Sequence, residues 1–196
     1  MYKKLNITEN HLQVLSLFTK GFDKEYYIRE VQKILKISPR TAQIILNDLE
    51  NKTILESSVK GKIKTYKIKK NYVAEEYMVL AEHYKKIVFL ETHELIREVL
   101  AKITPLIKGL GLVFGSYAKA LEKEESDLDI FVAGSYDKKS VKKISKTYGI
   151  EISIKSYPLN IFEENIKNDI LVKEVLKDHI TFLNAEEFVK MVLKNR

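Results

Sequence analysis

The sequence predicts an α+β protein built in two parts. Apolar residues follow a helical period through the first 51 residues and then alternate in two short segments, which predicts three helices and a β-hairpin. A strand, a small-residue turn, a helix and an acidic strand follow between residues 110 and 132, which predicts a small mixed sheet with flanking helices. We expect an N-terminal domain over 1–71, a helical linker over 72–104 and a C-terminal domain over 105–196.

The composition is that of a folded protein without a membrane span. Hydrophobic residues make up 45% of the 196 residues and charged residues 31%, enough to build real cores. No run approaches the roughly 18 apolar residues that a membrane span needs, and residues 1–6 lack a signal-peptide apolar region. We therefore expect a cytoplasmic protein with no membrane partner. The absence of cysteine excludes disulfides and thiolate ligands, which leaves carboxylates as metal ligands.

The excess positive charge is confined to the N-terminal third. Residues 1–71 hold 15 Lys and Arg against 7 Asp and Glu, a net charge of +8, whereas residues 72–196 hold 19 against 20, a net charge of −1. Such segregation is expected if the first part alone meets a polyanion. The sequence therefore favours nucleic-acid binding there and a different role for the rest.

Three helices are predicted before residue 52. Thr8 is placed to cap the first, the second is expected over 26–36, and the third is expected to end near Asn51. Ser38 and Pro39 give the third helix the clearest start, because serine is a good N-cap and proline suits the first helical position. The apolar faces are Leu12, Leu15 and Phe18, then Ile28, Val31, Ile34 and Leu35, then Ala42, Ile45, Leu46 and Leu49.

The third helix keeps a polar face outward, and a basic hairpin follows it. The polar residues at its start and on this face are Ser38, Arg40, Thr41, Gln43 and Asn47. Strands are expected over 55–59 and 62–69, joined at Lys60-Gly61, with lysines that include Lys60, Lys62 and Lys64.

Two helices, a polar-faced helix and a lysine-bearing hairpin resemble the winged helix-turn-helix family over roughly residues 8–70. The resemblance implies binding to duplex DNA, with the third helix in the major groove and the hairpin on phosphates or in the minor groove. The alternative is that the polar face and the lysines are ordinary solvated surface. A further alternative is a domain that binds only protein.

Residues 72–104 contain no glycine or proline and keep helical apolar spacing, so we expect one or two long helices. These helices either pack within their own chain or pair with a second copy, since dimers commonly bind two-fold symmetric DNA sites. The sequence is therefore compatible with both a monomer and a homodimer.

Residues 110–132 contain the side chains best suited to bind a metal ion and phosphate groups. A buried strand over 110–114 leads into Gly115-Ser116-Tyr117-Ala118-Lys119-Ala120, and ten residues separate Ser116 from Asp127-Leu128-Asp129. In a strand, residues i and i+2 face the same side about 6.5 to 7 Å apart, so the two aspartates can jointly hold a hard divalent metal. Gly115 permits a tight turn, and the Ser116 hydroxyl with the N–H groups of the next helix can hold a triphosphate.

A Gly-Ser turn followed by Asp-x-Asp resembles the nucleotidyltransferase superfamily that includes DNA polymerase beta and the minimal nucleotidyltransferases. The resemblance implies Mg2+ (or Mn2+) on Asp127 and Asp129 and an NTP held by Gly115, Ser116 and Lys119. An acceptor hydroxyl would then attack the α-phosphorus in line, with pyrophosphate leaving. The alternative, a plain turn and two solvent-facing aspartates, leaves the ordered strand-turn-helix-strand context unexplained.

Members of that superfamily usually carry a third carboxylate on a later strand. Here Ile150, Ile152 and Ile154 form the buried face of such a strand, and Glu151 is the only acid on the opposite face. By the resemblance, Glu151 would bind the metal or act as general base. Ser153 could instead take the equivalent position, which would leave the triad incomplete.

Two residues depart from the pattern of the superfamily, which often has arginine where Lys119 stands and glycine where Ala120 stands. Lysine offers a point charge in place of a bidentate fork for phosphate. Alanine adds a Cβ atom where the backbone approaches the nucleotide. Both departures bear on how well the site turns over.

The remaining segments are predicted to cover the sheet. We expect a lysine-rich helix over 137–148, helix again after Pro158, a short strand over 179–183, and a last helix that Asn184 and Glu187 start as a capping box. None of the four histidines stands at metal-ligand spacing from another, so we treat all of them as structural or surface residues: His11, His83, His93 and His179.

The sequence thus predicts an enzyme that transfers a nucleoside monophosphate from NTP to an acceptor hydroxyl, coupled to a DNA-binding domain. The alternative is a transcriptional regulator whose nucleotidyltransferase-like domain senses nucleotide without turnover. The sequence does not specify which nucleobase the NTP carries. It does not specify the acceptor either, because a protein side chain, a small molecule and an RNA end suit the same chemistry. A protein acceptor follows only from the likeness to minimal members of the superfamily.

Overall fold

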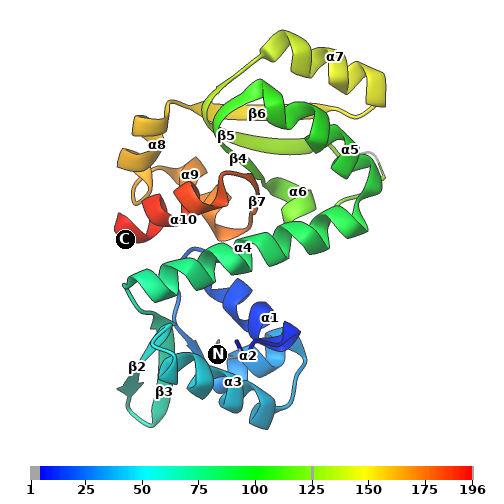
Figure 1. Cartoon of the computed structure of the whole chain (residues 1–196). Helices are drawn as coiled ribbons and strands as arrows, with labels where there is room; N and C mark the ends of the chain where they lie inside the picture. The colour runs from blue at the N-terminus through cyan, green and yellow to red at the C-terminus, as the bar shows by residue number, and fades with distance from the viewer. Residues whose placement is uncertain (1–4, 125, 196) are drawn as a thin grey trace. The chain divides into compact units, whose positions relative to one another are not determined.

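The computed structural model describes residues 5–124 and 126–195 and contains two compact units (Figure 1). The first unit ends at Ala81 and the second begins at Glu82, so the division falls inside helix α4 (Tyr72–Thr92). Each unit combines helices with a small sheet, which confirms the predicted α+β class.

Among the residues that the structure describes, the first unit holds three complete helices, the beginning of α4 and a three-stranded antiparallel sheet in the order β1-β3-β2. Its elements are α1 (Glu9–Phe18), β1 (Tyr26–Tyr27), α2 (Ile28–Leu35), α3 (Pro39–Asn51), β2 (Leu55–Lys60) and β3 (Ile63–Ile68). Helix α3 starts and ends as predicted. The Ser38 hydroxyl accepts a hydrogen bond from the Thr41 N–H at 3.0 Å, and the four apolar residues expected to face the core are all buried.

The predicted second helix was wrong at its start. Tyr26 and Tyr27 are extended and pair with Tyr66 and Thr65 of β3, so helix α2 begins only at Ile28. The Tyr26 ring is buried edge-on against Phe18, with ring centroids 5.2 Å apart. Pairing with a strand 40 residues further along, together with this burial, outweighs the local helical pattern.

The second unit is built on a four-stranded mixed sheet in the order β6-β5-β4-β7, in which only β5 and β6 run parallel. The strands are β4 (Ile107–Val113), β5 (Leu128–Tyr136), β6 (Ile152–Tyr157) and β7 (Ile180–Leu183). The helices are the end of α4, α5 (Glu94–Ile103), the 3-10 turn η1 (Thr104–Leu106), α6 (Gly115–Ala118), α7 (Lys138–Tyr148), α8 (Leu159–Asn165), α9 (Ile170–Lys177) and α10 (Ala185–Lys194).

The alternation of β5 divides its side chains between the two faces of the sheet. Leu128, Ile130 and Val132 are buried in a cluster with residues of α5 and α7. Phe131 faces the other way and packs against Phe162 of α8, with ring centroids 5.6 Å apart. Because side chains repeat every second residue, Asp129 lies on the Phe131 face.

The predicted capping box at residue 184 was wrong. Asn184 has φ +58°, and its side-chain amide donates to the Gly109 carbonyl at 2.6 Å instead of capping helix α10. Asparagine tolerates this left-handed conformation better than most residues. The side chain therefore ties the end of β7 to β4.

A polar cluster is buried where α4 meets β7. The Glu82 carboxylate is fully buried and accepts from Lys85 Nζ at 2.8 Å and from the Thr181 hydroxyl at 2.9 Å. His179 Nε2 lies 3.1 Å from the same carboxylate. Burial alone would raise the pKa of Glu82, but Lys85 and His179 hold it well below its ordinary value. The cluster fixes the middle of α4 to the sheet.

No helix among residues 5–124 and 126–195 is long and apolar enough to cross a membrane.

Candidate functional site

The Gly-Ser turn packs directly on the second aspartate. Gly115 has φ +72°, which favours glycine, and an added Cβ would lie 2.3 Å from Asp129 Oδ2. The Phe114 N–H donates to the Asp129 carbonyl at 3.0 Å, which extends the pairing of β4 with β5 to the start of the turn. Ser116 lies in α6, a single helical turn, and Lys119 is the C-cap residue of that turn. The structure thus brings the turn and Asp129 together.

The two aspartates lie at the start of β5. Asp127 directly precedes the strand and Asp129 is its second residue, half-buried. Burial raises the pKa of Asp129, the charge of Asp127 raises it further, and a hydrogen bond from Ser153 opposes this rise. A nearby cation would relieve the cost of holding both carboxylates ionised.

Ser153, not Glu151, is the residue of β6 that lies beside Asp129. The parallel register pairs Asp129 with Ser153, and the Glu151 carbonyl accepts from the Leu128 N–H at 2.8 Å. This register places Glu151 beside Asp127, just before β6 begins. Its side chain alternates to the same face as Ser153.

Two carboxylates suit magnesium without a third. Among the described residues, no three His, Asp or Glu side chains lie close enough together to hold one ion. Mg2+ is usually held by one or two carboxylates, with substrate phosphates and water filling its other positions. The two carboxylates of Asp127 and Asp129 are therefore the residues whose chemistry fits a divalent ion.

Two charged residues near the aspartates were missed by the sequence analysis. Lys155 of β6 and Glu174 of α9 both act on the charge of Asp129, and Glu174 forms an ion pair with Lys119 at 3.6 Å. Lys155 could have been found, because it alternates with Ser153 onto the same face. Glu174 could not, since only the packing of α9 brings it near.

Ala120 occupies a conformation that favours glycine. Its φ is +53°, and it follows helix α6 where the Ala120 N–H donates to the Tyr117 carbonyl and the Leu121 N–H to the Ser116 carbonyl. This pair of bonds is the Schellman motif, whose left-handed position is usually glycine. An alanine there costs roughly 1 to 2 kcal/mol. The alanine at position 120, where the superfamily often has glycine, therefore lowers the stability of the turn by straining its backbone.

His93 braces the segment that follows the turn. Its Nε2 atom lies 2.9 Å from Glu122 Oε1, and its ring stands edge-on to Tyr117 with centroids 5.8 Å apart. The hydrogen bond from His93 lowers the pKa of Glu122. His93 is the residue between helices α4 and α5. It therefore links the junction of these helices to Tyr117 in the turn and to Glu122 after it.

In the first unit, the polar residues of α3 differ in their exposure and in their hydrogen bonds. Arg40 and Gln43 are exposed. Ser38 and Thr41 bond to each other in the helix cap, and Asn47 accepts from the Tyr66 hydroxyl at 2.9 Å. Arg40 donates to Gln43 at 3.5 Å, and this exposed pair lies outside the helix cap and makes no bond to the sheet in the described residues.

The hairpin lysines also differ. Lys60 pairs with Glu25 at 2.8 Å, and Lys64 pairs with Glu50 at 2.6 Å. Lys62 is exposed and forms no ion pair with a residue that the structure describes. Two of the three lysines expected to meet phosphate are therefore partly neutralised within the chain.

The Gly-Ser turn is packed on Asp129, and the turn and the two aspartates are the residues on which the resemblance to nucleotidyltransferases rests. The model of the nucleotidyltransferase domain family matches residues 93–195, and the chain belongs to this family. No curated protein sequence matches the chain.

Among solved structures, the adhesin competence repressor (AdcR) from Streptococcus pyogenes is similar at 14% identity and a TM-score of 0.38, over 51% of this chain and 70% of that chain. A likeness of this size supports no conclusion about the protein described here.

Proposed function

We propose that the second unit transfers a nucleoside monophosphate from an NTP to an acceptor hydroxyl with the help of Mg2+. The contact between Gly115 and Asp129 carries this proposal, because it sets the turn that bears Ser116 and Lys119 against the paired carboxylates. Membership of the nucleotidyltransferase domain family supports the same reaction class.

The residues divide into two roles. The Ser116 hydroxyl and Lys119 hold the triphosphate, for which Lys119 must leave Glu174. Asp127 and Asp129 would hold Mg2+, which when bound supplies positive charge to the phosphates. The Mn2+ ion suits the same donors.

The transfer forms a bond between the acceptor oxygen and the α-phosphorus and breaks the bond from that phosphorus to the pyrophosphate oxygen. The acceptor hydroxyl loses its proton as it attacks. Glu151 is the proposed general base for this proton, since it lies beside Asp127 and its side chain is exposed. Pyrophosphate leaves with the electron pair of the broken bond.

For the first unit we propose binding to duplex DNA through α3 and the β2–β3 hairpin. The net charge of +8 over residues 1–71 supports this role, as does the exposed position of Arg40, Gln43 and Lys62.

The reaction is tested by incubating the protein with each α-labelled NTP, Mg2+ and candidate protein, RNA and small-molecule acceptors. Label transfer and pyrophosphate release are expected in wild type and not in Asp127→Asn/Asp129→Asn. A control with the same change of charge is Glu186→Gln/Glu187→Gln, two exposed carboxylates of α10. Equal transfer by both double variants would overturn the proposal.

A nucleotide sensor without turnover is the second candidate. Two observations favour it: the missing third carboxylate among the described residues, and the strained Ala120. It predicts that labelled NTP binds in an Asp129-dependent way, whereas no pyrophosphate is released with any acceptor.

A further inference from the structure

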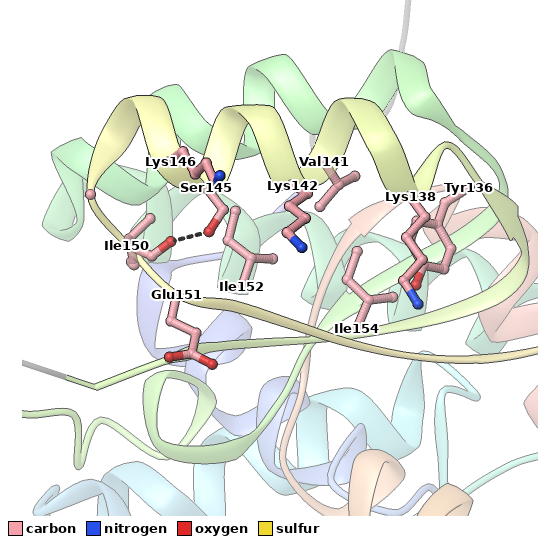
Figure 2. A pocket seen from close by; sticks show the side chains of 11 residues that line it. Tyr136, Lys138, Val141, Lys142, Ser145, Lys146, Ile150, Glu151, Ile152 and Ile154 are labelled. Carbon is pink, nitrogen blue, oxygen red and sulfur yellow. Dashed lines mark hydrogen bonds between the residues drawn. The ribbon is translucent and has the colours of Figure 1, made fainter.

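A groove runs between helix α7 and the edge strand β6 (Figure 2). It has a volume of about 560 Å3. Its wall on the helix side carries three lysines, and Ile152 and Ile154 form its wall on the strand side. Figure 2 shows Lys138 and Lys142 extending from α7 toward β6. Apart from Glu151, none of the residues that line the groove belongs to the site described above.

The strand wall of the groove has an open edge. Among the described residues, β6 pairs only with β5. The Glu151 carbonyl points toward β5, where it accepts from Leu128. Successive residues of a strand direct their N–H and C=O groups to opposite edges, so Ile152 and Ile154 present theirs to the open edge. Such an edge can accept an added strand.

The helix wall of the groove is positively charged, and helix α7 supplies no acidic residue to neutralise this charge. Lys138, Lys142 and Lys146 stand four residues apart on one face of α7, a helix without a single acidic residue. None of the three forms an ion pair with a residue that the structure describes. The charge is therefore available to a ligand.

The spacing of these lysines matches an extended peptide. Four residues of helix rise about 6 Å. Two residues of strand rise about 6.7 Å, and alternate side chains of a strand share one face. A strand added to β6 would thus set every second side chain opposite one lysine of the row.

We propose that this groove binds an extended, acidic segment of a partner protein. The segment adds to the sheet beside β6 and places carboxylates at alternate positions against Lys138, Lys142 and Lys146. A nucleic-acid strand suits the groove less, because base stacking needs aromatic side chains and Tyr136 is the one aromatic residue in the described lining.

The position of the groove connects it with the proposed function. One end of the groove is formed by Gly149 and Glu151, and Glu151 lies beside Asp127. If the nucleotidyl transfer proposed above holds, a segment bound here would carry the acceptor hydroxyl. Binding itself requires neither nucleotide nor metal, so it is tested separately.

The test measures binding of fluorescein-labelled twelve-residue peptides to the full chain by anisotropy, without nucleotide or metal. One peptide alternates Glu with Val and Thr, a second has the same composition with its acids in one block, and a third is the alternating peptide with alternate backbone N–H groups methylated. The expected order is tight binding of the first and at least tenfold weaker binding of the other two.

The lysines are tested with a matched pair of variants. Lys138→Glu/Lys142→Glu changes two lysines of the groove, whereas Lys139→Glu/Lys143→Glu changes two on the same helix that do not line it. The first is expected to weaken binding at least tenfold and the second less than twofold. Equal loss in both variants would overturn the proposal, as would failure of wild type to bind the alternating peptide. A single-stranded oligonucleotide that binds instead, with loss in the groove variant, would also overturn it.

Discussion

The backbone of Gly115 lies against the carboxylate of Asp129, so closely that a Cβ atom at residue 115 would stand 2.3 Å from Oδ2. This contact links the turn that bears Ser116 to the strand that bears the aspartates. Its importance is open to direct test, because the chain contains a glycine with a similar φ and free space around it.

Gly115→Ala is expected to reduce nucleotidyl transfer at least 100-fold, because the added methyl group displaces the Asp129 carboxylate and a misplacement of about 1 Å can cost that factor. The control is Gly61→Ala, in the hairpin of the first unit, at φ +64° with nothing within 4 Å of the added atom. Both variants carry similar backbone strain, but only the first should lose activity and Mg2+-dependent nucleotide binding. Equal losses would show that strain alone is responsible.

Ala120→Gly is expected to raise the free energy of unfolding by about 1 kcal/mol, since glycine adopts φ +53° without the steric cost that alanine bears. Urea denaturation followed by circular dichroism measures this change. Ala118→Gly, at the last residue of helix α6, should instead lower the stability by roughly 0.5 to 1 kcal/mol. If Ala120→Gly also lowers the stability, the left-handed turn is not what limits the wild type.

Asp129→Asn is expected to stabilise the metal-free protein at neutral pH. Burial and Asp127 raise the pKa of Asp129 in the folded state. Wild type therefore loses stability as the pH rises from the ordinary aspartate pKa, about 3.9, through the raised one. The melting temperatures of variant and wild type should differ at pH 7 and converge near pH 4.

Mg2+ with a nonhydrolysable NTP should reverse that order. A ligand at 100 times its Kd stabilises the folded protein by about 2.7 kcal/mol. The gain is expected for wild type and not for Asp129→Asn. An equal rise in melting temperature in both proteins would place the metal-nucleotide complex elsewhere.

Lys62→Ala is expected to weaken binding to duplex DNA more than Lys64→Ala does. Lys64 is already paired with Glu50, whereas Lys62 has no such partner among the described residues. Titrations at several salt concentrations should show the slope of log K against log salt fall by about 1 for Lys62→Ala and by less for Lys64→Ala. The reverse order would indicate that the Lys64–Glu50 pair opens on DNA.

Several elements could be predicted because their causes are local. Ser38 and Pro39 fix the start of α3, and two alternating segments around Lys60-Gly61 fix the hairpin. The strand-turn-helix-strand order around Gly115 and Asp129 was likewise predictable from a few adjacent residues.

Elements whose causes lie far along the chain could not be predicted. Tyr26 is extended because β3 is there to pair with it, and Asn184 is left-handed because its side chain reaches Gly109. The sequence around Lys119 did not predict its ion pair with Glu174, because only the packing of helix α9 brings Glu174 close to Lys119.

The sequence by itself determined the pair of aspartates, the turn before them and the separation of charge between the two parts, because each depends on the kind and spacing of neighbouring residues. Only the tertiary structure decided which residue of β6 stands beside Asp129. A parallel pair of strands has a register that one residue of slippage would change, and the packing of Leu128, Ile130 and Ile152 in one core sets it. That register puts Ser153 beside Asp129 and leaves Glu151 beside Asp127, at the end of the groove along β6.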